Sequence, residues 1–196
     1  MTNFETLDVS KRERIINAAM DEFRYGYKKA STDAIVRKAG ISKGLLFHYF
    51  DSKKNLYKYL LNFAVEMIQK EYSGLIGQSE GRDTIETVLR FAGAHENLLK
   101  SFPHVYSFLN GLYVNTEDSI GADMWALYTQ KKDAMMQQMY EWCDTSVFKD
   151  GIDPKMAIDI ICWTMDGFFN NKFEENQDYF EPLKKYLEIL RKHFYK

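Results

Sequence analysis

The chain has 196 residues, a formal net charge of −2 and 45% apolar residues. A chain of this length can bury a substantial core in one or two domains. We expect neither a membrane-spanning helix nor a secretory signal, because the sequence has no apolar run of about 18 residues and its start lacks a basic segment followed by an apolar one.

Charge is distributed unevenly along the chain. Residues 1–60 hold 12 Lys and Arg against 7 Asp and Glu, a net charge of +5, whereas residues 61–196 hold 14 against 21, a net charge of −7. A basic N-terminal third can meet the phosphates of nucleic acid, while an acidic remainder is repelled by them. Charged residues that are merely solvated could give the same uneven distribution. The charge distribution therefore indicates DNA binding only in combination with a DNA-binding motif.

Hydrophobic spacing and helix-capping residues predict nine α-helices and no β-strand. Residues 1–8 are expected to form a frayed tail, and Ser10 with Glu13 gives a capping-box pattern at the start of the first helix. Capping residues predict two further helix starts, one after Asn115-Thr116 and one at Asp178. The expected helices cover residues 10–25, 31–39, 43–50, 53–76, 83–100, 103–113, 117–144, 154–176 and 178–195.

Residues 31–50 indicate two short helices around a tight turn. Ser31 or Thr32 can cap the first helix, and Ser42 can cap the second. Gly40 can end the first helix, since glycine adopts left-handed dihedral angles without a Cβ clash. This pattern predicts a helix-turn-helix, whose second helix enters the major groove of DNA.

The identities of the residues in and after this hairpin are a more specific signal than the spacing of its two helices. The run from Ala39 to Gly44, the aromatic run from Phe47 to Phe50 and the segment from Ser52 to Leu56 resemble the signature of the TetR (tetracycline repressor) family. The resemblance implies an all-α, nine-helix fold with a helix-turn-helix DNA-binding domain over residues 1–52 and an effector-binding and dimerisation domain over residues 53–196. It also implies a cytoplasmic homodimeric regulator, usually a repressor, that binds palindromic operator DNA.

The second helix of the hairpin supplies most candidates for DNA contact. Lys43 can bind a phosphate or a guanine edge, and His48 can donate a hydrogen bond to a base or a phosphate. The resemblance implies that Tyr49 contacts the DNA backbone and that Lys53 contacts a phosphate. The amide groups near Thr32 can hold a phosphate at a helix N-terminus. The expected contact residues are Thr32, Ser42, Lys43, Leu45, Phe47, His48, Tyr49 and Lys53.

Two of these positions depart from the usual family pattern. Leu45 stands where a threonine is usual, and Phe47 stands where a tyrosine is frequent. Both replace a hydroxyl with an apolar group, so contact with thymine methyl groups becomes a reasonable expectation. A core role for Phe47 fits the sequence equally well.

The resemblance further implies an effector pocket among the later helices. Aromatic and sulfur-containing side chains suit a hydrophobic or aromatic ligand, although core packing explains any one of them as well. His95 can orient a ligand or be a buried histidine of the core. The expected effector residues are Phe63, Met67, Phe91, His95, Phe108, Trp125, Tyr128 and Trp163.

The last two helices carry more apolar positions than a single core face requires. The surplus suits the intersubunit four-helix bundle that the family typically uses. The expected dimer residues are Ile161, Met165, Phe168, Tyr186, Leu187 and Leu190.

The sequence offers little for catalysis. No phosphate-binding glycine loop, metal-ligand spacing or nucleophile–base pair is recognisable, so we expect no cofactor, no metal and no enzyme. Cys143 and Cys162 are expected to be free buried thiols. Two alternatives stay open: a TetR-fold DNA-binding protein controlled by a protein partner instead of a small molecule, and a helical enzyme that only resembles the family.

Overall fold

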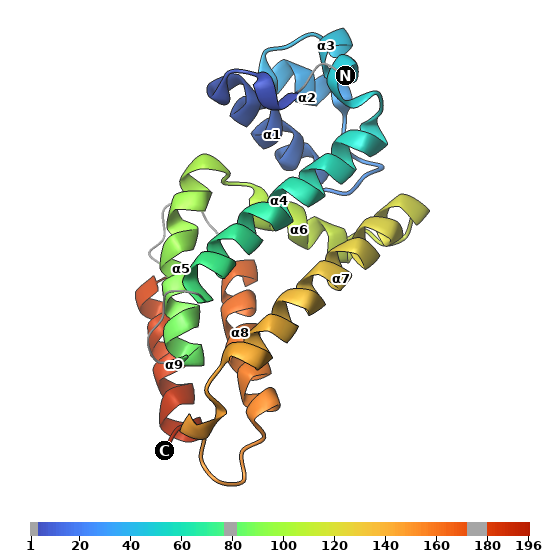
Figure 1. Ribbon diagram of the computed structural model, residues 1–196. Coiled ribbons are helices and arrows are strands. Elements are labelled where there is room, and N and C mark those ends of the chain that lie inside the picture. The colour runs from blue at the N-terminus through green and yellow to red at the C-terminus, as the bar shows by residue number, and fades with distance from the viewer. Residues whose placement is uncertain (1–3, 77–81, 172–179) are drawn as a thin grey trace. The chain divides into compact units, whose positions relative to one another are not determined.

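The computed structural model describes residues 4–76, 82–171 and 180–196 of an all-helical protein (Figure 1). Within these ranges there are nine α-helices and two short 3₁₀ helices, η1 (Phe4–Thr6) and η2 (Thr145–Val147). No helix in the described ranges is long and apolar enough to cross a membrane. The α-helices are α1 (Val9–Phe23), α2 (Thr32–Ala39), α3 (Lys43–Phe50), α4 (Lys53–Ile76), α5 (Thr84–Ser101), α6 (Val105–Val114), α7 (Ser119–Trp142), α8 (Pro154–Asn171) and α9 (Phe180–Phe194).

Two helix starts differ from the expected ones because a carboxylate takes the capping position. The side chain of Asp8, not that of Ser10, accepts the hydrogen bond at the start of α1. Asp118 likewise accepts from the backbone N–H of Gly121 at 2.9 Å, so α7 begins beyond Asn115-Thr116. A carboxylate also interacts favourably with the positive end of the helix dipole. The expected end of α8 near residue 176 and the cap at Asp178 lie outside the described residues.

The expectation of a frayed tail is wrong for residues 4–8. Phe4 is only 6% exposed and belongs to the core of the N-terminal region. The backbone N–H of Leu7 donates to the carbonyl of Phe4 at 3.2 Å, which closes a turn. Burial of a phenylalanine side chain offsets the entropy cost of ordering so short a segment.

The chain divides into two compact units. The first consists of Met1–Met67 and Leu98–Lys131, and the second consists of Ile68–Asn97 and Lys132–Lys196. The division falls inside α4, α5 and α7, so each of these helices contributes to both units. The expected functional boundary after residue 52 remains a prediction.

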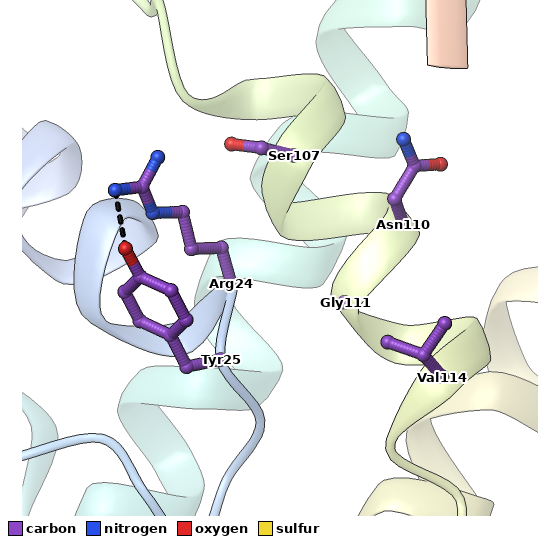
Figure 2. A pocket seen from close by; sticks show the side chains of 6 residues that line it. All are labelled: Arg24, Tyr25, Ser107, Asn110, Gly111 and Val114. Carbon is purple, nitrogen blue, oxygen red and sulfur yellow. Dashed lines mark hydrogen bonds between the residues drawn. The ribbon is translucent and has the colours of Figure 1, made fainter. Parts of the chain in front are cut away.

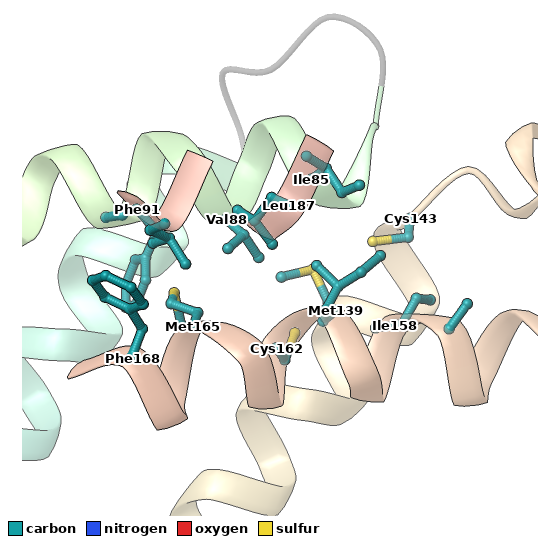
Figure 3. Packing of buried hydrophobic residues seen from close by; sticks show 14 of the residues in the cluster. Ile85, Val88, Phe91, Met139, Cys143, Ile158, Cys162, Met165, Phe168 and Leu187 are labelled. Atoms are coloured by element: carbon teal, nitrogen blue, oxygen red, sulfur yellow. The ribbon is translucent and has the colours of Figure 1, made fainter. Parts of the chain in front are cut away.

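The core of the second unit is built from α5, α7, α8 and α9, together with Tyr72 of α4. Figure 3 shows aliphatic, aromatic and sulfur-containing side chains of these helices packed together, including Val88, Met139, Ile158 and Leu187. Cys143 and Cys162 lie in the same cluster, and both are free and buried, as the sequence predicts. Burial raises the pKa of the Cys143 thiol above its ordinary value, so this sulfur is a weak nucleophile at neutral pH.

Candidate DNA-binding surface

The hairpin of α2 and α3 has the geometry that its sequence predicts. Ser31 and Ser42 cap the two helices by accepting hydrogen bonds from the N–H groups of Ala34 and Leu45, at 3.3 and 3.2 Å. Gly40 ends α2 with φ 66° and ψ 40°, in the left-handed region that favours glycine. The eight-residue helix α3 therefore starts after a short, fixed turn.

Helix α2 is held against α1 by ion pairs. The ammonium of Lys38 lies 2.5 Å from an oxygen of Asp21 and 2.6 Å from an oxygen of Glu22. Burial alone would raise the pKa of Asp21, but the Lys38 hydrogen bond and nearby positive charges lower it on balance. The backbone N–H of Ser31 also donates to Glu22 at 3.3 Å. These contacts fix the orientation of the hairpin on α1.

Helix α3 has one buried side and one accessible side. Leu46 and Phe50 are buried at 1% and 6% exposure, one helical turn apart. Lys43, Gly44 and His48 are exposed, while Leu45, Phe47 and Tyr49 are half-buried. Phe47 therefore does not share the core environment of Phe50, and its side chain can contribute to a contact surface.

The polar groups of this surface already have neighbours within the protein. The ammonium of Lys43 lies 2.8 Å from a carboxylate oxygen of Asp33 on α2. The ring of Tyr49 makes edge contacts with the rings of His48 and Phe4, with centroids 5.5 Å apart in both pairs. Neither Asp33 nor Phe4 was expected from the sequence to touch a candidate DNA contact.

Lys53 and Thr32 are less accessible than a simple phosphate contact would suggest. The ammonium of Lys53 lies 4.6 Å from the ring centroid of Tyr27 and 6.0 Å from that of Phe23. Partial burial lowers the pKa of Lys53, and the charge of Asp118 opposes this shift. Thr32 is half-buried at the first position of α2.

Exposed charge in this region is predominantly positive. The exposed acidic residues from α1 to the start of α4 are fewer than the basic ones, and Asp33 and Asp51 are the two on or beside the hairpin. Such an excess attracts a polyanion at long range and makes binding dependent on salt. The exposed basic residues are Arg14, Lys28, Lys29, Arg37, Lys38, Lys43, Lys54 and Lys58.

The candidate effector residues are distributed over both compact units. Phe63, Met67, Phe108, Trp125 and Tyr128 belong to the first, whereas Phe91, His95 and Trp163 belong to the second. The ring centroids of Trp125 and Tyr128 lie 5.6 Å apart, and those of Phe91 and His95 lie 3.9 Å apart. Trp163 is 63% exposed on α8 and does not share the buried environment of Phe91 and His95.

His95 is the most unusual polar residue of the second unit. It is 1% exposed, and its Nδ1 lies 3.3 Å from Oε2 of Glu71 on α4. Burial lowers the pKa of His95, while Glu71 and the more distant Asp166 oppose that shift. The ring also contacts those of Phe91 and Phe169. This environment favours the neutral imidazole.

The candidate dimer residues do not all lie on a free surface. Ile161 and Leu187 have no exposed area in the single chain, and Met165 and Phe168 are buried at 9% and 7% exposure. They pack in the protomer's own core, since α8 and α9 must first cover each other. Leu190 is half-buried. Of the predicted residues, Tyr186 is exposed, and other apolar side chains on the same two helices are exposed as well, namely Ile189 on α9 and Met156, Ile160 and Trp163 on α8.

Comparison with known proteins agrees with this architecture. Residues 15–60, which extend from α1 into α4, match the family model described as "Bacterial regulatory proteins, tetR family". PfmR from Thermus thermophilus, a TetR family transcriptional regulator, is 19% identical with a TM-score of 0.64, over 92% of this chain and 98% of that one. The ketosteroid transcriptional regulator KstR2 of Mycobacterium tuberculosis is 15% identical with a TM-score of 0.68, over 97% of each chain.

A third solved structure contains a ligand. The transcriptional regulator FadR from Bacillus subtilis, in complex with stearoyl-CoA, is 18% identical with a TM-score of 0.59, over 90% of this chain and 96% of that one. At these identities the solved structures share the fold. Residues 15–60 therefore match the DNA-binding region of tetR-family regulatory proteins, and the chain as a whole shares the fold of the solved TetR-family structures.

Proposed function

We propose that this protein is a TetR-type transcriptional regulator, a cytoplasmic, homodimeric repressor that binds near-palindromic operator DNA through α3 and is released by a hydrophobic or aromatic small molecule. One observation carries the DNA-binding part: α3 is anchored by buried Leu46 and Phe50, and it leaves Lys43 at its first position and His48 on the side opposite Leu46 exposed. Two-fold symmetry then requires half-sites about one helical turn apart, roughly 34–36 Å.

The side chains of α3 suit different parts of DNA. Lys43 is long and exposed, and its ion pair with Asp33 is weak enough to be exchanged for a phosphate or a guanine. His48 can read a base, and the hydroxyl of Tyr49 can donate to a phosphate. Leu45 and Phe47 offer apolar contact with thymine methyl groups. Ser42, Thr32 and Lys53 remain proposed phosphate contacts near the ends of the helices.

Quantitative DNA binding tests this proposal. The probe is a duplex that the wild-type protein selects from a random-sequence library, measured at fixed salt concentration. Lys43→Ala and Tyr49→Ala should weaken binding about 5- to 150-fold, which corresponds to roughly 1–3 kcal/mol for loss of a good contact. Lys70→Ala, which removes an exposed charge from α4, is the matched control and should bind normally. Normal affinity for both α3 variants would exclude this helix from the contact surface.

His48 should act on sequence preference more than on affinity. If it reads a base, His48→Ala relaxes the preference at one position of each half-site, by a factor of about 5 to 100. Repeating the library selection with this variant gives that measurement directly. An unchanged preference together with weaker binding would move His48 to the phosphate backbone.

The proposed dimer uses the accessible apolar residues of α8 and α9. Trp163 is 63% exposed, and Ile160 and Ile189 are 38% and 56% exposed. Large exposed apolar side chains on two packed helices are the kind of surface that a partner subunit covers. The family's four-helix bundle pairs these helices with those of a second copy, which gives two recognition helices per dimer.

The proposed effector acts through the helices shared by both units. α4 begins directly after the recognition helix, and its 24 residues are shared between the two units. FadR, which binds stearoyl-CoA, and KstR2, a ketosteroid regulator, support a hydrophobic effector class. An effector shifts the equilibrium between the DNA-binding and the released conformation only as far as its affinities for these two conformations differ. If the effector weakens DNA binding by a given factor, operator DNA must weaken effector binding by the same factor.

Reciprocal titrations test the effector. Long-chain acyl-CoA and a panel of flat aromatic compounds are titrated with and without saturating operator, using tryptophan fluorescence. A true effector should bind about 5- to 150-fold more weakly to the operator complex. Met67→Trp should abolish the response and preserve DNA binding, because a larger side chain narrows the proposed site. Equal affinities in both titrations would favour control by a protein partner instead.

A further inference from the structure

We propose that the N-terminal turn containing Phe4 and Glu5 positions Tyr49 for DNA binding. The proposal rests on the proposed function, since it gives Tyr49 a contact with DNA. Phe4 is 6% exposed, with ring centroids 5.5 Å from Tyr49, 4.8 Å from Phe50 and 5.2 Å from Tyr59. The first two belong to α3 and the third to α4, so one side chain connects the end of the recognition helix with the next helix.

Glu5 fastens the same turn at two further points. One carboxylate oxygen accepts from the hydroxyl of Tyr59 at 2.6 Å, and the other accepts from the guanidinium of Arg12 at 2.9 Å. Arg12 also donates to the backbone carbonyl of Glu5 at 3.1 Å. Burial, together with the Glu5 carboxylate, raises the pKa of Tyr59, so its hydroxyl remains a donor at neutral pH. The turn is thus attached to α1, α3 and α4.

This attachment matters for Tyr49 because its side chain lies at the edge of the accessible side of α3. Tyr49 is half-buried, with Phe4 on one part of its ring and His48 on another. Immobilising a free side chain on binding costs entropy, and packing in the free protein removes that cost beforehand. Phe4 is therefore a positioning residue, and the Tyr49 hydroxyl is the group that would meet DNA.

A double-mutant cycle tests this coupling, with the library-selected duplex as the probe. Phe4→Ala should weaken binding about three- to tenfold in the wild-type protein, the loss expected for one unrestrained side chain. In a Tyr49→Ala background the same change should have no further effect, because the group that Phe4 positions is absent. Phe4→Leu fills most of the same space and should bind within about twofold of wild type.

The control variant is Phe102→Ala. Phe102 is also 6% exposed and lies in the same compact unit, but its ring contacts Phe63 instead of α3. The Phe102→Ala variant should have its unfolding midpoint lowered about as much as the Phe4→Ala variant, but it should bind DNA normally. Equal losses from Phe4→Ala in both backgrounds, or an equal loss from Phe102→Ala, would overturn the inference. Failure of the wild-type protein to select any duplex would instead overturn the proposed function.

Discussion

The backbone carbonyl oxygen of Arg24 lies only 2.4 Å from the point that a Cβ atom on Gly111 would occupy. The C-terminal end of α1 therefore approaches the backbone of α6 more closely than any other residue at position 111 would allow. Arg24 and Tyr25 line a hollow of about 300 Å³ together with Ser107, Asn110 and Val114 of α6. Figure 2 shows these side chains. This approach joins α1, which carries the hairpin, to α6 within the first compact unit.

Gly111→Ala should destabilise the protein by about 1–3 kcal/mol, because the new methyl group meets backbone that cannot rotate away. In an unobstructed helix the same change would stabilise by about 0.5–1 kcal/mol. Gly74→Ala in α4 is the matched control, since nothing lies within 4 Å of its added Cβ. Urea unfolding of both variants should show shifts of opposite sign. A stabilised Gly111→Ala protein would show that the close approach is relieved at little cost.

The turn of the hairpin gives a second test of backbone conformation. Gly40 has φ 66°, and an added Cβ would meet no atom within 4 Å, so any loss in a variant comes from the dihedral angle alone. Gly40→Ala should cost about 1–2 kcal/mol. Gly40→Asn should recover part of this loss, because asparagine tolerates the left-handed region better than alanine. Equal unfolding midpoints for the two variants would contradict the assignment.

The hairpin was predictable because its determinants are local. Ser31, Gly40 and Ser42 act on the backbone within three or four residues, so capping and dihedral preference identify them from the sequence. Phe4 was not predictable by the same means. Its burial depends on Tyr59, which lies 55 positions later in the chain, and no local pattern carries that contact.

The apolar rows of α8 show a different gap between sequence and structure. The surplus of apolar residues indicates that α8 has two apolar faces, but composition alone does not say which residues belong to the buried face and which to the exposed one. Met156, Ile160 and Trp163 recur at helical spacing, as do the buried Ile158, Ile161 and Met165. A helical projection separates the two rows, yet only the packing of α5, α7 and α9 determines which one is covered.

The assembly prediction follows from this distinction. Ile189→Glu places a charge on the accessible row of α9 and should convert a dimer into a folded monomer, because burying an unpaired carboxylate is costly. Leu187→Glu, two positions earlier and without exposed area, should unfold the chain instead. Gln138→Glu adds the same charge at an exposed position of α7 and should remain dimeric. Sedimentation and circular dichroism distinguish the three outcomes, and a dimeric Ile189→Glu protein would exclude this face.

The buried histidine predicts a dependence of stability on pH. Burial lowers the folded-state pKa of His95, with Glu71 and Asp166 in partial opposition. Lys132 pairs with Asp166 and reduces the influence of that carboxylate. In the unfolded chain the imidazole takes up a proton near pH 6.5. The unfolded state therefore binds more protons below about pH 6.5, and stability falls as pH decreases through that value.

Below about pH 6.5 this residue should contribute a slope of up to about 1.4 kcal/mol per pH unit to the free energy of unfolding, and above it almost none. His95→Gln removes the titrating group, so the decrease in stability between about pH 7.5 and about pH 5 should become smaller. His193→Gln is the matched control, because it makes the same substitution at an exposed position of α9, outside the buried core. Asp21, whose pKa is lowered from 3.8, affects stability only at more acidic pH. Urea unfolding at several pH values measures these slopes, and equal profiles for wild type and His95→Gln would show that the imidazole is free to take up a proton in the folded core.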